Sequence, residues 1–145
     1  MVSFVYGQET VNQEEQSAAS KNIVFSAGLL MGGGSLIGVD LEFVIPTTCL
    51  GIQIGGGING YGAGINYHLT SKPNSSFISL QYWNQGFGDN HYASYLGPMF
   101  VFRAKKLFQA GLGIGSVVKK GPRWESTVKD EKVNMALLYN IGIYF

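Results

Sequence analysis

The chain has 145 residues, which is enough for one domain and too few for two of ordinary size. Only 13% of the residues are charged, about half of the usual share, whereas 13% are aromatic and 21 residues are glycine. The net charge of +1 excludes the global basic field of many nucleic-acid-binding proteins, and the single cysteine, Cys49, excludes an intrachain disulfide.

Residues 11–21 are polar, rich in Gln, Glu and Ser, and show no apolar period. Val5-Tyr6-Gly7, followed by Gln8, has the small-residue spacing of a signal-peptidase site, although no basic start or full apolar core precedes it. We interpret residues 1–21 as a possible signal-peptide remnant followed by a flexible polar tail. A disordered chain end is the alternative interpretation.

From residue 22 onward, large apolar side chains alternate with small or polar ones, which indicates β-strands. The alternation divides into eight segments, at residues 22–32, 35–45, 49–57, 61–69, 76–85, 91–103, 107–119 and 133–145. Pro98 interrupts the sixth segment and requires a bulge or a missing ladder bond there. Residues 22–39 and 49–71 contain no charged residue and could be mistaken for transmembrane helices. Their many glycines argue against this, because each would destabilise a helix by roughly 1 kcal/mol.

The two faces of these predicted strands differ in bulk. One face is continuous Leu, Ile, Val and aromatic side chains, and the other is rich in glycine with scattered polar residues. The narrow interior of an eight-stranded barrel accepts the small face, so we expect the bulky face to point outward into lipid. Segments of this length can cross a bilayer, and closure keeps every backbone group paired. The predicted fold is all-β, a closed eight-stranded antiparallel up-and-down transmembrane β-barrel over residues 22–145.

The connectors suggest an orientation. Short turns at 46–48, 70–75 and 104–106 would face the periplasm, and the long charged loop at 120–132 would face outside. Aromatic side chains fall at two levels along the strands, as expected for two membrane interfaces.

The last segment resembles the terminal-aromatic signature of small eight-stranded outer-membrane barrels of the OmpA/OmpX type. The residues that carry this resemblance are Leu137, Tyr139, Ile141, Ile143 and Phe145. The resemblance implies a bacterial outer-membrane location, recognition by the outer-membrane assembly machinery, a lipid bilayer as partner and a monomeric state. The short outer loops depart from that family.

Polar side chains on the small face are expected to fill the interior. Asp40 and Glu42 lie two apart on one strand, so both carboxylates would enter the barrel, and Arg103 would neutralise one of them from across it. We interpret the set as an internal polar network that plugs the barrel, with a proton or small-ion path as the alternative. The predicted members are Asp40, Glu42, Gln53, Asn66, His68, Ser79, Gln81, Arg103, Gln109, Asn134 and Asn140.

An enzymatic alternative uses His68 as base, Ser79 or Ser26 as nucleophile and Glu42 to orient the imidazole. It would act on lipid acyl chains, but His68 is expected near the inner rim, away from the outer lipid face. No cofactor, metal site or nucleic-acid partner is predicted. The sequence therefore favours a non-enzymatic outer-membrane barrel with a structural or surface-interaction role. A barrel lipid enzyme and a soluble lipocalin-like carrier are the alternatives.

Overall fold

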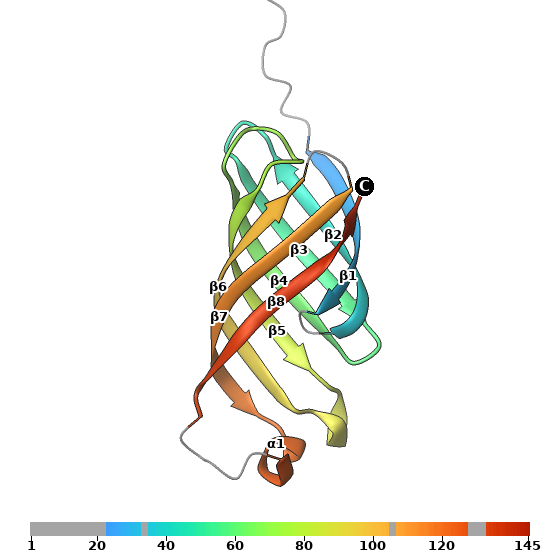
Figure 1. The fold of residues 1–145 in the computed structure, drawn as a ribbon, viewed down its shortest axis with the longest axis vertical. Helices are drawn as coiled ribbons and strands as arrows, with labels where there is room; N and C mark the ends of the chain where they lie inside the picture. The colour runs from blue at the N-terminus through green and yellow to red at the C-terminus, as the bar shows by residue number, and fades with distance from the viewer. Residues whose placement is uncertain (1–22, 33–34, 105–106, 128–132) are drawn as a thin grey trace, which may run out of the picture.

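The computed structural model describes residues 23–32, 35–104, 107–127 and 133–145, which form a closed barrel of eight antiparallel strands in chain order (Figure 1). The predicted all-β, eight-stranded, up-and-down architecture is confirmed, and the predicted strand limits differ from the observed ones by no more than two residues. Residues 1–21, interpreted above as a possible signal-peptide remnant and a flexible polar tail, lie outside the described residues. The strands are β1 (Val24–Gly32), β2 (Ser35–Ile45), β3 (Leu50–Gly57), β4 (Gly60–His68), β5 (Phe77–Gln85), β6 (Ala93–Arg103), β7 (Phe108–Lys120) and β8 (Met135–Tyr144).

The bulky face of the strands points outward. Ile52, Ile65 and Leu112 are 61%, 60% and 61% exposed, whereas the alternating neighbours Gln53 and Asn66 are buried. Because successive side chains of a strand point to opposite faces, this pattern places the large apolar residues on the outside of the barrel. The interior is therefore polar over much of its length.

The pairing of β6 with β7 is irregular around Pro98. The register passes from Leu96 opposite Ser116 to Met99 opposite Gly113, with no paired residues between them. Proline has no N–H to contribute to the ladder, which explains the interruption that the sequence predicts. The two strands are nonetheless close, since a Cβ atom on Gly97 would lie 1.9 Å from the carbonyl oxygen of Ile114.

The two ends of the barrel differ. The proximal end carries Val24 and Phe145, together with the short β2–β3, β4–β5 and β6–β7 connections (Figure 1). The distal end carries a 3-10 helix, η1 (Gly88–Asn90), in the connection between β5 and β6. It also carries a short helix, α1 (Pro122–Thr127), in the loop between β7 and β8 that the sequence predicts to be longest. In the part of the chain that is described, neither helix is long and apolar enough to cross a membrane.

The distal rim is uneven. The β1–β2 and β3–β4 hairpins end well short of the β5–β6 hairpin and of α1, so one wall of the barrel is higher than the other (Figure 1). An apolar cluster packs inside the higher wall, formed by Trp83, Ala93, Tyr95, Met99, Trp124 and Leu138.

Candidate functional site

The centre of the polar interior is the carboxylate of Glu42 on β2. Its Oε2 lies 2.6 Å from Nη1 of Arg103, which reaches it from β6, and its Oε1 lies 3.0 Å from Nε2 of His68 on β4. The Nδ2 group of Asn66 donates a hydrogen bond to the same Oε1 atom. Two strands, β4 and β6, thus supply one positive side chain and two further polar partners to a fully buried carboxylate on β2, as a charge in a dry interior requires.

Arg103 is held on every side. Its Nε donates to Oε1 of Gln109 at 3.0 Å, and its Nη1 donates to the carbonyl oxygen of Pro73 at 2.8 Å. Its guanidinium carbon lies 4.8 Å from the ring centroid of Phe77 and 4.7 Å from that of Tyr144. Hydrogen bonds and cation–π contacts in this number fix the side chain and close the proximal part of the interior.

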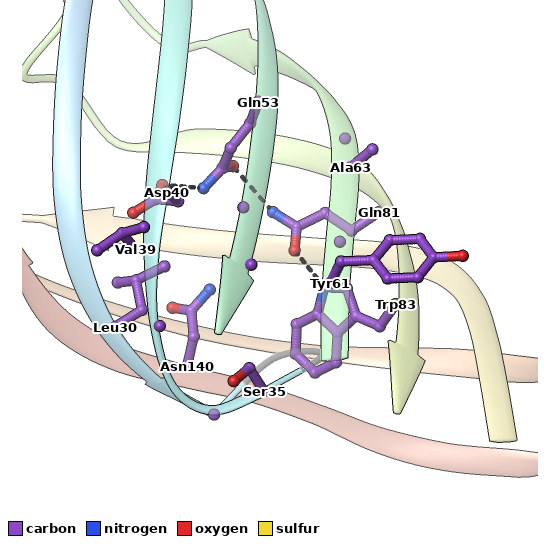
Figure 2. Close-up of a pocket in the computed structure, with 16 residues that line it drawn as sticks. Leu30, Ser35, Val39, Asp40, Gln53, Tyr61, Ala63, Gln81, Trp83 and Asn140 are labelled. Atoms are coloured by element: carbon purple, nitrogen blue, oxygen red, sulfur yellow. Dashed lines mark hydrogen bonds between the residues drawn. The ribbon is translucent and has the colours of Figure 1, made fainter. Parts of the chain in front are cut away.

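A chain of amide side chains continues from this ion pair toward the distal end. Oε1 of Gln53 accepts hydrogen bonds from Nδ2 of Asn66 and from Nε2 of Gln81, each at 3.1 Å. Oε1 of Gln81 accepts a hydrogen bond from Nε1 of Trp83 at 2.7 Å. Figure 2 shows Gln53 between Asp40 and Gln81, with Trp83 beyond Gln81. The network therefore runs continuously through the barrel.

Asp40 is the second buried carboxylate. Its Oδ2 accepts a hydrogen bond from Nε2 of Gln53, and its Oδ1 has no hydrogen-bond partner among the described residues. Gly28 makes room for it, because a Cβ there would lie 2.3 Å from Oδ1. A cavity of about 60 Å³ adjoins Asp40, Gln81 and Trp83, which is space for water but too little for an organic ligand (Figure 2).

Ten of the eleven residues predicted for the interior are buried, and these ten include both carboxylates and Arg103. Asn134 is the exception: its side chain is exposed, and it precedes β8. The prediction extended the strand alternation two residues too far. At this height β1 has already ended, since it pairs with β8 only between Asn140 and Tyr144, so no wall encloses Asn134 on that side.

The proposed catalytic group does not assemble as the sequence suggested. Ser79 donates to Oδ1 of Asn66 at 2.5 Å, and His68 instead contacts Oγ of Ser75 through Nδ1 at 3.2 Å. A Ser75–His68–Glu42 chain results, but His68 is 1% exposed and Ser75 also donates to the carbonyl oxygen of Thr70. These contacts tie the β4–β5 turn to the barrel wall. Strand alternation gave no signal for Ser75, because it lies in a turn.

A second polar cluster lies on the β5–β6 hairpin at the distal end. Oγ of Ser94 donates to Oδ1 of Asn84 at 2.8 Å, and it lies 3.1 Å from Nε2 of His91. Nδ2 of Asn84 donates to the carbonyl oxygen of Gly86. Ser94 is fully buried, so this cluster is closed to substrates and stabilises the hairpin. Strand alternation gives no signal for this cluster, because His91 lies in the connection before β6 and Asn84, the acceptor for Ser94, lies across the hairpin.

No group of three or more His, Cys, Asp or Glu side chains in the described ranges is placed to hold a metal ion. Comparison with known proteins adds no assignment: no protein-family model matches the chain, and no curated protein or solved structure matches it either.

Proposed function

We propose that the chain is a non-enzymatic β-barrel of the bacterial outer membrane, similar to the OmpA/OmpX type, with a structural or surface-interaction role. It would lie in the lipid bilayer as a monomer. The single observation that carries this proposal is the inversion of the barrel, which has large apolar side chains outside and charged and amide side chains inside.

The outer surface is difficult to reconcile with water. Soluble monomers rarely expose contiguous apolar patches beyond a few hundred Å², whereas here every strand contributes large exposed apolar residues. In a bilayer the same side chains are solvated by hydrocarbon, and a closed barrel pairs the backbone groups that hydrocarbon cannot satisfy. Representative outward residues, one from each strand, are Leu29, Val39, Ile52, Ile65, Leu80, Phe100, Leu112 and Ile141.

The interior supports a plugged barrel rather than an ion path. Arg103 is held between two aromatic rings and three polar partners, and its guanidinium neutralises Glu42 in place. The cavity beside Asp40 measures only about 60 Å³. An ion would have to displace these contacts to pass, so the network favours stability over conduction.

The C-terminal strand supports recognition by the outer-membrane assembly machinery. Its proposed signal residues share the outward face of β8, and their exposure ranges from 39% for Ile143 to 65% for Leu137. A row of exposed apolar side chains ending in an aromatic residue would be accessible to the assembly machinery before the barrel closes. These residues are Leu137, Tyr139, Ile141, Ile143 and Phe145.

The test is the electrophoretic mobility in SDS of protein refolded in detergent, unheated against boiled, with flotation of the protein on liposomes. We expect a mobility shift on boiling and co-flotation with lipid. Absence of the shift, together with solubility in detergent-free buffer, would overturn the proposal and favour a soluble carrier. Unchanged lipid A or phospholipid hydrolysis on His68→Ala would remove the enzymatic alternative.

A further inference from the structure

A cavity of about 820 Å³ opens at the distal end of the barrel. Its volume falls within the range of roughly 300–1,000 Å³ that is typical of small-molecule sites. We call it the distal vestibule and define it by Leu36, Trp83, Tyr95, Arg123, Leu138 and Tyr139. Trp83, Tyr95 and Leu138 are buried, so its inner wall is apolar and aromatic.

The distal vestibule also opens sideways through the barrel wall. β8 pairs with β7 from Met135 to Ile143 but with β1 only from Asn140 to Tyr144, so residues 135–139 have one partner strand among the described residues. The vestibule contacts Leu138, which is 1% exposed, and also Tyr139, which is 54% exposed on the opposite face of β8. The lining of the vestibule therefore includes residues from both faces of β8, next to the edge that β1 leaves unpaired among the described residues.

The lining of the distal vestibule has the chemistry of an amphiphile site. Arg123 is the only charged side chain among its described lining residues, and no described carboxylate lines it. Residues 135–139 of β8 add backbone groups that have no β1 ladder partner among the described residues, and such groups are costly to leave unsatisfied beside hydrocarbon. An anionic head group can pair with Arg123, while an apolar chain packs against Trp83 and Leu138.

We propose that the distal vestibule binds a long-chain fatty acid that enters sideways from the surrounding bilayer, past the free edge of β8. The carboxylate would lie at Arg123 and the acyl chain would extend toward Trp83. This inference rests on the proposed insertion of the barrel in a membrane and adds a ligand to it.

The test uses Trp83 as an internal reporter. The chain has two tryptophans, so Trp124→Phe leaves Trp83 as the only indole, and its ring is 5% exposed inside the barrel. Dibromostearic acid is titrated into the variant in liposomes, because bromine quenches an indole only at close range. We expect saturable quenching, with an apparent affinity at least about tenfold weaker for Arg123→Gln, as for loss of a charged hydrogen bond.

A pair of matched substitutions separates the vestibule from the outer surface. Ala136→Phe fills the vestibule, which Ala136 lines, and should abolish the saturable quenching. Ala110→Phe makes the same change on β7, outside the vestibule lining, and should leave the quenching intact. Dibrominated octadecylamine, which carries the opposite charge, should bind more weakly than the acid.

The outcomes also separate this inference from the proposed function. Protein that floats with liposomes and shifts on boiling, but shows only non-saturable quenching equal to that by brominated phospholipid, would overturn the fatty-acid site alone. The fatty-acid site would also be overturned if Trp83 is quenched equally with and without Ala136→Phe in the Trp124→Phe protein. Protein that neither floats nor shifts would overturn both proposals.

Discussion

Nη1 of Arg103 lies 2.6 Å from Oε2 of Glu42, and the two side chains are 1% and 0% exposed. The pair joins β6 to β2 across the interior, between strands that are not neighbours in the sheet. Oε2 has no hydrogen bond of good geometry, so this ion pair is the contact that compensates its charge. The stability of the barrel therefore depends on both partners being present.

We expect Arg103→Gln and Glu42→Gln each to lower the free energy of unfolding by about 3–5 kcal/mol, because each leaves an uncompensated buried charge. The double variant should lose less than the sum of the two. Urea unfolding in lipid vesicles, followed by tryptophan fluorescence, measures this cycle. Lys72→Gln, on an exposed turn residue at the same end, is the control. Additive losses would show that the pair is not coupled.

Gly97→Ala should destabilise the β6–β7 pair by about 1–3 kcal/mol through overpacking. The added Cβ would lie 1.9 Å from the carbonyl oxygen of Ile114, and a backbone atom cannot swing aside. Gly56→Ala is the matched control, since its Cβ would have no contact closer than 3.8 Å. The temperature at which the unheated SDS band converts to the boiled form measures the difference. Equal temperatures would contradict the close approach of the strands.

Ile65→Arg tests the medium around the barrel. Ile65 is 60% exposed in the middle of β4, where an arginine facing hydrocarbon should cost about 2–4 kcal/mol. Leu69→Arg, one residue beyond the strand end, should cost about 0–1 kcal/mol because it lies near the interface. Unfolding in vesicles gives both values. If the two substitutions proved equally harmless, the outward face would be in water.

Phe145→Ser should reduce the amount of barrel assembled in cells without reducing its refolding in detergent. Phe145 is 64% exposed, so its ring adds little to the folded core, and its backbone N–H still bonds the carbonyl oxygen of Ala27 at 2.7 Å. Phe102→Ser, on another outward ring outside the C-terminal strand, is the control. Immunoblots of outer-membrane fractions report assembly. Equal loss in both variants would indicate general destabilisation rather than a lost recognition signal.

The sequence by itself determined the strands and their faces. Period-two alternation is a local property, so residues such as Ile52 and Gln53 could be assigned to opposite faces without knowledge of any partner strand. Because one face is bulky and the other is rich in glycine, only the glycine-rich face fits inside an eight-stranded barrel, and the bulky face must point outward. Even the defect at Pro98 follows from local chemistry, since the ring removes a donor wherever the strand lies.

Only the tertiary structure decided which interior side chains meet. Strand register and barrel closure set the height at which each inward residue lies, and neither can be read from the alternation of a single strand. Thus Arg103 was expected to neutralise one carboxylate, and closure selected Glu42 over Asp40. Register and closure also decide that Ser75 contacts His68 and that Asn134 is exposed. They leave an unpaired edge on β8 among the described residues, because β1 ends before β8 does.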